Sequence, residues 1–113
     1  MAGHITREEL RARIERGDEF VLLETLGPDT YAYGHLPGAL NLPPDDVKRR
    51  ARELIPNYDA EIVVYCANRG CQASTQAANQ LKALGYTNVR DYLDGKADWI
   101  EAGLPLEKST PAR

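Results

Sequence analysis

The chain is poor in several residue types, and each shortage excludes a class of protein. Its 113 residues include only two cysteines, too few for the disulfide framework of a small secreted domain. No apolar run approaches the ~20 residues that a membrane-spanning helix needs. The two histidines, His4 and His35, do not have the spacing of metal ligands. Basic residues are not in surplus either, and a net charge of −3 argues against a nucleic-acid or acidic-membrane surface.

The rest of the composition is that of one soluble domain. Hydrophobic residues make up 42% of the chain and charged residues 27%. A chain of this length buries roughly 65% of its unfolded surface, which is enough for one core without disulfides. We expect a single domain over 1–113, with its core at about 5–106 and a flexible tail at 107–113. The first residues lead into a polar helix without a signal-peptide pattern, so we expect a cytoplasmic protein.

Strands and helices alternate along the chain. Buried strands are predicted at 20–24, 61–66 and 89–93. Helices are predicted at about 7–16, about 46–54, 72–84 and 96–102. The first begins with a capping box from Thr6 to Glu9, and the second has Asp45 or Asp46 as its cap. Residues 25–44 are rich in Gly and Pro, so we expect mostly loop there, with a short strand at 39–42. This alternation predicts an α/β fold with a small parallel sheet flanked by helices.

A cysteine stands where one predicted strand ends. Residues 61–66 read EIVVYC, a buried strand ending in Cys66, and a polar loop and then a helix follow. The loop N–H groups and the helix N-terminus favour a thiolate, which holds the thiol pKa below its ordinary value. Ligand sites in parallel sheets lie at the carboxyl ends of strands, where Glu24 and Asp94–Gly95 also stand. We therefore predict that Cys66 is a catalytic nucleophile, the alternative being a buried structural cysteine.

The loop after Cys66 supplies the candidate substrate contacts. We assign substrate binding to Ala67, Asn68, Arg69, Gly70, Cys71 and Gln72. Arg69 is a candidate to hold an anionic donor, with a solvated loop arginine as the alternative. The backbone N–H groups of Asn68, Gly70 and Gln72 are candidates for an anion-binding nest. Cys71 is a candidate resolving thiol toward Cys66, although the sequence slightly favours a residue that only fills the first helical turn.

Three further residues have structural interpretations. Gly34 and Pro37 surround His35, which favours a histidine that fixes a turn over a catalytic one. Ser74 is expected to cap the helix that follows the loop. Trp99 is expected to anchor the last helix in the core.

Four stretches of the chain resemble the rhodanese-like family. They are YGHLPGALNLP (33–43), VVYC (63–66), LGYTNV (84–89) and DGKADW (94–99), with AGLPL (102–106) after the last. They follow the family's order and span the chain from about Ile5 to Leu106. The resemblance implies a rhodanese-like α/β fold. It also implies that Lys96 faces the active-site cleft.

The activity that this resemblance implies is sulfur transfer. Cys66 would take a sulfane sulfur from thiosulfate, a persulfide or a polysulfide, and would hold it as a persulfide. It would then pass the sulfur to cyanide, a thiol or an acceptor protein. The implied partners are therefore a small sulfur donor and a thiol or protein acceptor, with no metal, organic cofactor, nucleic acid or membrane. The sequence sets no oligomeric state.

The chain also departs from the family pattern. The position five residues after the cysteine, often arginine in the family, is Cys71, and the first glycine of the usual pair is Asp94. Thr30 replaces the acidic residue before the GHLPGA stretch, and Leu26 replaces an arginine after the first strand. The stretch from Cys66 to Gly85 is longer than the commonest pattern, which predicts an enlarged loop.

Two alternative functions follow from related proteins. A cysteine-dependent phosphatase or arsenate reductase would need Cys-x5-Arg spacing, but position 72 is glutamine. A non-catalytic rhodanese-like interaction module is disfavoured because Cys66 is present.

Overall fold

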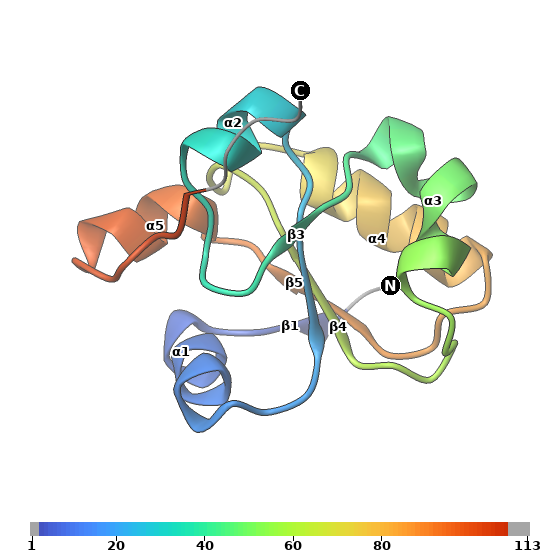
Figure 1. Ribbon diagram of the computed structural model, residues 1–113, viewed down its shortest axis with the longest axis horizontal. Coiled ribbons are helices and arrows are strands. Elements are labelled where there is room, and N and C mark those ends of the chain that lie inside the picture. The colour runs from blue at the N-terminus through green and yellow to red at the C-terminus, as the bar shows by residue number, and fades with distance from the viewer. Residues whose placement is uncertain (1–2, 109–113) are drawn as a thin grey trace.

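Five short parallel strands form one sheet in the computed structural model, which describes residues 3–108 (Figure 1). The strands are β1 (Gly3–His4), β2 (Val21–Glu24), β3 (Leu40–Asn41), β4 (Ile62–Tyr65) and β5 (Val89–Tyr92), in the spatial order β1-β5-β4-β2-β3. The helices are α1 (Arg7–Arg16), α2 (Pro28–Tyr33), α3 (Val47–Leu54), α4 (Ala73–Ala83) and α5 (Gly95–Glu101), with a 3₁₀ turn, η1 (Pro44–Asp46), before α3. The predicted α/β architecture is confirmed.

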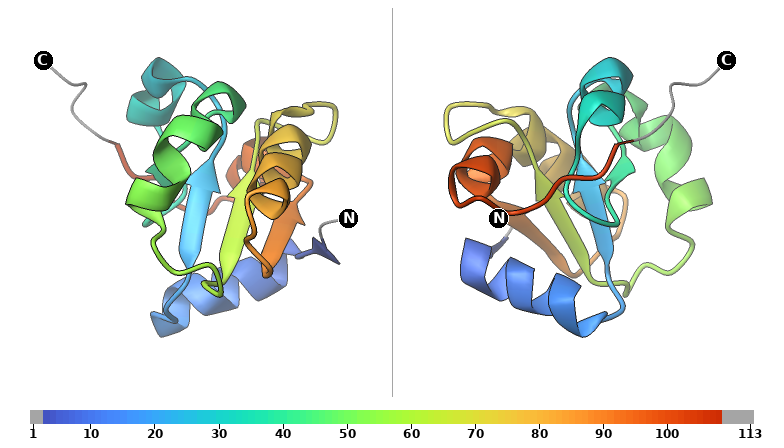
Figure 2. Two further views of the ribbon diagram at one scale, coloured as in Figure 1. Left: turned by 90° about the vertical axis from the view of Figure 1, so that its right-hand side faces the viewer. Right: turned by 60° about the vertical axis from the view of Figure 1, so that its left-hand side comes forward.

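Helices cover both faces of the sheet (Figure 2). Successive strand residues point to opposite faces, and Val63 and Val64 of β4 accordingly belong to two different cores. The core around Val64 includes residues of α3 and α4, whereas the core around Val63 includes Leu10 of α1 and Trp99 of α5. Because both faces are buried, β2 and β4 are nearly continuous apolar runs, which is why these two strands were visible in the sequence.

Helix α1 begins and ends at the residues that the sequence predicted. The Thr6 hydroxyl accepts a hydrogen bond from the Glu9 N–H at 3.1 Å, and the Glu9 carboxylate accepts one from the Thr6 N–H at 3.1 Å. Gly17 ends α1 with a φ of 72°, a conformation that glycine adopts without strain. The capping box and the C-terminal glycine are both confirmed.

Three local features differ from the sequence predictions. Residues Pro28–Tyr33 form helix α2 inside the expected loop, and none of this helix's residues is buried, so it has no apolar stripe to reveal it. His4 pairs with Asp91 as part of β1, a strand that was not predicted because two residues are too short for a sequence pattern. The Asp46 side chain makes no capping bond to α3 and instead pairs with Arg49 at 2.6 Å.

The segment after α5 returns to the body of the domain. The Trp99 indole N–H donates to the Pro105 carbonyl at 2.8 Å, and Trp99 is buried as expected. The expected flexible tail begins with Glu107, whose backbone exchanges two hydrogen bonds with His35, at 2.8 and 2.9 Å. Residues 109–113 of that tail lie outside the described residues. No helix among residues 3–108 is long and apolar enough to span a bilayer.

Candidate active site

Cys66 lies directly after β4, a strand that is paired on both sides, with β2 and with β5. Its side chain is 1% exposed. The Cys66 carbonyl accepts a hydrogen bond from the Lys96 N–H at 2.9 Å, and the Ala67 carbonyl accepts one from the Ala97 N–H at 2.8 Å. These donors belong to the first turn of α5, where backbone N–H groups have no partner within the helix. The first turn of α5 therefore fixes the backbone at the cysteine.

Gly95 makes this contact with α5 sterically feasible. Its φ is +73°, and a Cβ at this position would lie 2.7 Å from the Cys66 carbonyl oxygen and 2.9 Å from the Asn68 nitrogen. A side chain would therefore overlap the backbone of the loop as well as strain the glycine's own conformation. The sequence predicted that Gly95 lies at the end of a strand, but no local pattern indicated its close contact with the backbone of the Cys66 loop.

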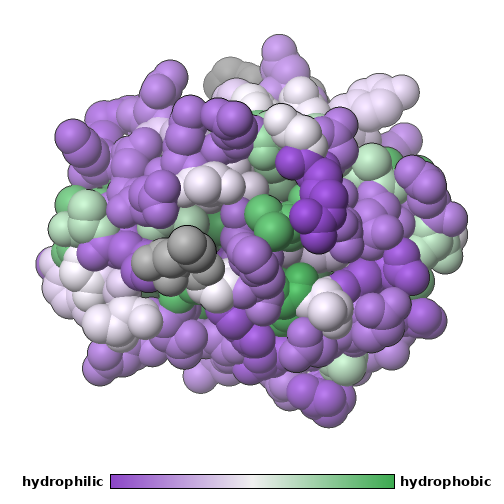
Figure 3. Space-filling view, turned by 180° about the vertical axis from the view of Figure 1, so that it is seen from behind, coloured by the Kyte–Doolittle hydropathy of each residue, from purple (hydrophilic) through white to green (hydrophobic). Residues whose placement is uncertain are grey.

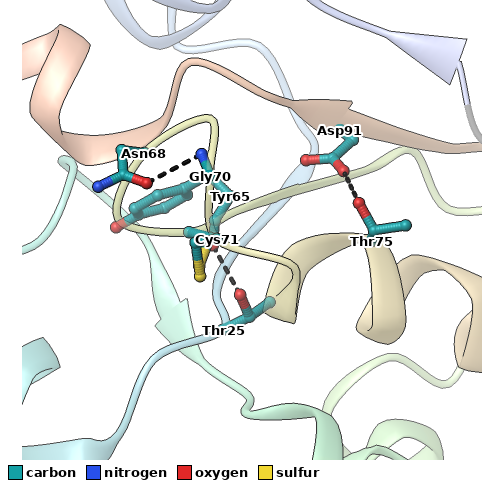
Figure 4. The surroundings of a disulfide bond; sticks show 8 residues. Thr25, Tyr65, Asn68, Gly70, Cys71, Thr75 and Asp91 are labelled. Atoms are coloured by element: carbon teal, nitrogen blue, oxygen red, sulfur yellow. Dashed lines mark hydrogen bonds between the residues drawn. A yellow bond between two sulfur atoms is a disulfide. The ribbon is translucent and has the colours of Figure 1, made fainter.

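The loop after Cys66 is a tight turn built on Asn68 (Figure 4). The Asn68 side-chain oxygen accepts a hydrogen bond from the Gly70 N–H at 3.0 Å, and the Asn68 carbonyl accepts one from the Cys71 N–H at 3.1 Å. The N–H of Gly70, one of the expected anion-binding donors, is therefore used inside the loop. This leaves Asn68 and Gln72 as the remaining donors of the expected nest.

The turn brings the two cysteines together. Cys66 and Cys71 form a disulfide, with their Cα atoms 6.2 Å apart. Cys71 precedes α4, which begins at Ala73, so it does not fill a position in that helix's first turn. The interpretation of Cys71 that the sequence slightly favoured is therefore wrong. Cys66 is buried, whereas Cys71 is partly exposed.

Arg69 of the loop is paired with a carboxylate. Its Nε lies 2.8 Å from Oδ1 of Asp94, and both side chains are substantially exposed. An exposed pair of this kind contributes about 0–1 kcal/mol to stability. Its larger effect is electrostatic, because the carboxylate offsets the positive charge that Arg69 would otherwise offer to an anionic donor.

Lys96 forms an ion pair with a buried carboxylate. Its Nζ lies 2.8 Å from Oε1 of Glu24, and the two side chains are 11% and 0% exposed. The same carboxylate oxygen accepts a hydrogen bond from the Tyr65 hydroxyl at 2.8 Å. The Tyr65 hydroxyl in turn accepts one from the Leu36 N–H at 3.0 Å. Burial and, next, the negative charge of Glu24 raise the pKa of Tyr65 far above its ordinary value, so this hydroxyl keeps its proton.

Asp91, on β5, is a second buried carboxylate and lies next to the first turn of α4 (Figure 4). The Thr75 hydroxyl donates to its Oδ2 at 3.3 Å, and Ser74 also hydrogen-bonds to it. Ser74 therefore contacts Asp91, and no side chain caps α4, contrary to expectation. Burial raises the pKa of Asp91, against the opposing effect of these hydrogen bonds. The sequence analysis missed this carboxylate, although it lies inside the predicted strand at 89–93, directly after Arg90.

The described residues offer little support for other kinds of site. Within residues 3–108 no group of three or more His, Cys, Asp or Glu side chains is arranged to hold a metal ion. A cavity of about 400 Å³ lies at the opposite end of the sheet, where its walls include Phe20, Val21 and Pro56. On the face shown in Figure 3, apolar residues form small separate patches among hydrophilic ones.

Cys66 is a buried cysteine at the carboxyl end of a parallel strand, and its backbone is held by α5. This arrangement defines a class of domain. The sequence profile of the "Rhodanese-like domain" matches residues 6–102. The chain therefore belongs to the rhodanese-like family, as the resemblance of its motifs predicted.

Particular relatives show how such domains are used. The chain is 33% identical to a sulfurtransferase of Allochromatium vinosum over 94% of this chain and 95% of that protein. It is 36% identical to the HTH-type transcriptional regulator Rv0324 of Mycobacterium tuberculosis over 95% of this chain, but it spans only 46% of that regulator. Among solved structures, the rhodanese-like domain of the Anabaena protein Alr3790 superimposes with a TM-score of 0.84. That match is 30% identical and covers 100% of this chain and 87% of the other.

Proposed function

We propose that this domain is a sulfurtransferase that carries a sulfane sulfur on Cys66. The observation that carries the proposal is the placement of Cys66, which is buried at the carboxyl end of β4 with its backbone held by two N–H groups of α5. A rigidly placed thiol next to a loop of N–H groups is the arrangement that favours a nucleophilic thiolate. The name of the Allochromatium relative agrees with this chemistry.

The reaction proceeds in two displacements at sulfur. The Cys66 thiolate attacks the sulfane sulfur of the donor, a new S–S bond forms, and the donor's remaining fragment leaves with the electron pair. An acceptor thiolate or cyanide then attacks the outer sulfur of the Cys66 persulfide, and Cys66 leaves as the thiolate. The loop residues Ala67 to Gln72 surround the persulfide, with the Asn68 and Gln72 N–H groups available to its negative charge. The reaction needs no metal or organic cofactor.

The charges around Cys66 favour a persulfide or polysulfide donor over thiosulfate. Thiosulfate is a dianion, so its binding requires cations that are not already neutralised. Arg69 is paired with Asp94, and Lys96 is paired with the buried Glu24. A persulfide donor carries less charge at its reacting end and depends less on these two side chains.

Intact-protein mass is the direct test of the carrier role. The reduced protein is incubated with glutathione persulfide, and separately with thiosulfate, as wild type, Cys66→Ser and Cys71→Ser. We expect Cys71→Ser to gain one sulfur, about 32 Da, and to lose it to cyanide, whereas Cys66→Ser gains none. A folded Cys71→Ser protein that gains no mass with either donor would contradict the proposal.

A charge variant tests the donor preference. Asp94→Asn frees the Arg69 guanidinium, so we expect kcat/KM for thiosulfate to rise by about fivefold, with a smaller change for glutathione persulfide. Asp18→Asn is the matched control, because Asp18 also pairs with an arginine, Arg16, but follows α1 rather than the active-site loop. Equal effects of both variants on thiosulfate would argue against a role for the Arg69–Asp94 pair.

A further inference from the structure

The pairing of Cys66 with Cys71 points to a second reaction of the same site. We propose that the domain reduces its own persulfide and releases hydrosulfide, with Cys71 as the resolving thiol. This inference rests on the proposed function, because it begins from sulfur held on Cys66. It adds a reductive outcome to a site whose proposed reaction only transfers sulfur.

The loop is built to bring Cys71 to Cys66. Asn68 accepts two hydrogen bonds in this turn, one from the Gly70 N–H and one from the N–H of Cys71 itself. They fix the backbone that carries the Cys71 side chain. The resulting Cα separation of 6.2 Å lies within the range that a disulfide requires. The chain has no other cysteine, so each of the two has one available partner.

The resolving step balances without a further reactant. The Cys71 thiol passes its proton to the outer sulfur of the Cys66 persulfide, and the resulting Cys71 thiolate attacks Sγ of Cys66 and forms the Cys66–Cys71 S–S bond. The bond between Sγ of Cys66 and the outer sulfur breaks, and the outer sulfur leaves as HS⁻ with the electron pair. The sulfane sulfur is reduced by two electrons to sulfide, and the two cysteines are oxidised to the disulfide.

Attack on the inner sulfur is the outcome that the structure favours. Sγ of Cys71 is bonded to Sγ of Cys66, so the loop reaches the inner sulfur without rearrangement of the strand. Attack on the outer sulfur would instead move the persulfide to Cys71 and would leave no disulfide. The Cys66–Cys71 disulfide of the structure is the bond that the first path would form.

A dithiol reductant returns the site to its starting state. Cys66 is 1% exposed and Cys71 is partly exposed, so we expect an incoming thiolate to attack the Cys71 sulfur first. That attack forms a mixed disulfide on Cys71 and expels Cys66 as the thiolate. The second thiol of the reductant then releases Cys71. Cys66 thus leaves the cycle in the nucleophilic form that the next donor needs.

A single-turnover experiment tests this cycle. Reduced protein, freed of reductant, is mixed with one equivalent of glutathione persulfide, and sulfide and intact mass are followed together. For wild type we expect one equivalent of sulfide and a protein about 2 Da lighter than the reduced form. Cys71→Ser should instead retain the added sulfur, about 32 Da, and release sulfide only at the background rate that Cys66→Ser shows.

Turnover with dithiothreitol gives a second, independent readout. Wild type should release sulfide at least about tenfold faster than Cys71→Ser, because the resolving thiol is held next to the persulfide. The circular dichroism of Cys71→Ser is compared with wild type, so that a folding defect is recognised.

The outcomes separate this inference from the proposal beneath it. If folded Cys71→Ser protein takes up no sulfur, both the proposed sulfur transfer and the resolving step are overturned. If Cys71→Ser loads and wild type keeps a stable persulfide on Cys66, sulfur transfer stands and the resolving step is wrong. If the added sulfur in wild type is found on Cys71, with no disulfide, Cys71 is a relay and the reductive path is overturned.

Discussion

At the scale of single residues, one glycine determines whether Cys66 can be held in place. Gly95 approaches the loop backbone so closely that any Cβ would meet the Cys66 carbonyl oxygen and the Asn68 nitrogen. The Cys66 carbonyl and the neighbouring Ala67 carbonyl connect the nucleophile to α5, because they accept hydrogen bonds from the Lys96 and Ala97 N–H groups. A residue without chemistry of its own therefore controls the geometry of the reacting thiol.

Gly95→Ala tests this steric role. We expect a loss of about 2–4 kcal/mol in the free energy of unfolding, since the substitution adds a backbone overlap to an unfavourable left-handed conformation. Sulfur loading of Cys66 should fall as well, because the loop must move. Urea denaturation and persulfide loading measure the two effects.

Gly103→Ala is the matched control for that variant. Gly103 has a similar φ, +75°, but a Cβ there meets nothing within 4 Å. It should cost only about 1–2 kcal/mol and should leave loading unchanged. Equal costs for the two variants would show that contact with the loop adds nothing.

At the scale of elements, a buried ion pair joins α5 to the end of β2. Lys96 of α5 and Glu24 of β2 are almost completely removed from water, and Tyr65 of β4 shares the same carboxylate oxygen. Removing two charges from water is costly, so such a pair stabilises little relative to apolar residues. Its effect is on position, because breaking it leaves a charge without compensation. The pair thus fixes α5 at the site where that helix holds the Cys66 loop.

Lys96→Met removes one side of this ion pair. We expect it to lower the free energy of unfolding by about 3–5 kcal/mol, because Glu24 remains buried without its counter-charge. In the double variant Glu24→Gln/Lys96→Met the buried charge is gone, and most of that loss should be recovered. Thermal and urea unfolding of the three proteins measure it. A double variant less stable than Lys96→Met would contradict this account.

At the scale of the whole molecule, stability depends on pH through a carboxylate in the sheet. Asp91 is 3% exposed, its Oδ1 has no hydrogen-bond partner among the described residues, and burial raises its pKa above the ordinary value of 3.8. Between 3.8 and this raised value the native state binds more protons at Asp91 than the unfolded state does. The contribution of Asp91 to stability is therefore greatest below pH 3.8, and it decreases as pH rises through that interval.

Asp91→Asn removes this pH dependence. The stability of Asp91→Asn relative to wild type should therefore increase between pH 3.5 and pH 7, whatever the cost of the amide itself. Urea unfolding of both proteins at several pH values gives the difference directly, and effects of other carboxylates cancel. His4, whose positive charge lowers the pKa of Asp91, is the neighbour to replace in a second comparison. A difference that is constant with pH would contradict the assignment.

The sequence by itself determined the architecture and the position of the cysteine. Apolar strands buried on both faces and a complete capping box are local patterns, so β2, β4 and α1 were predictable within a residue or two. Strand β5 was also predicted, although it contains Arg90 and Asp91. Cys66 follows one of those strands directly, and its placement at a strand end came from the same pattern. Helix α2, with no buried residue, and the two-residue β1 lacked any such pattern and were missed.

Only the tertiary structure decided the surroundings of that cysteine. The partners of Lys96, Arg69 and Asp91 lie on other elements or elsewhere along the chain, and no local spacing encodes them. Glu24, for example, is separated from Lys96 in sequence but meets it because parallel strands bring their carboxyl ends to one edge of the sheet. Cys71 is near Cys66 in sequence, yet whether the two meet depended on the path of the Asn68 turn. The pattern of buried residues in a strand or helix can be read from the local sequence, whereas contacts between elements exist only after the sheet has assembled.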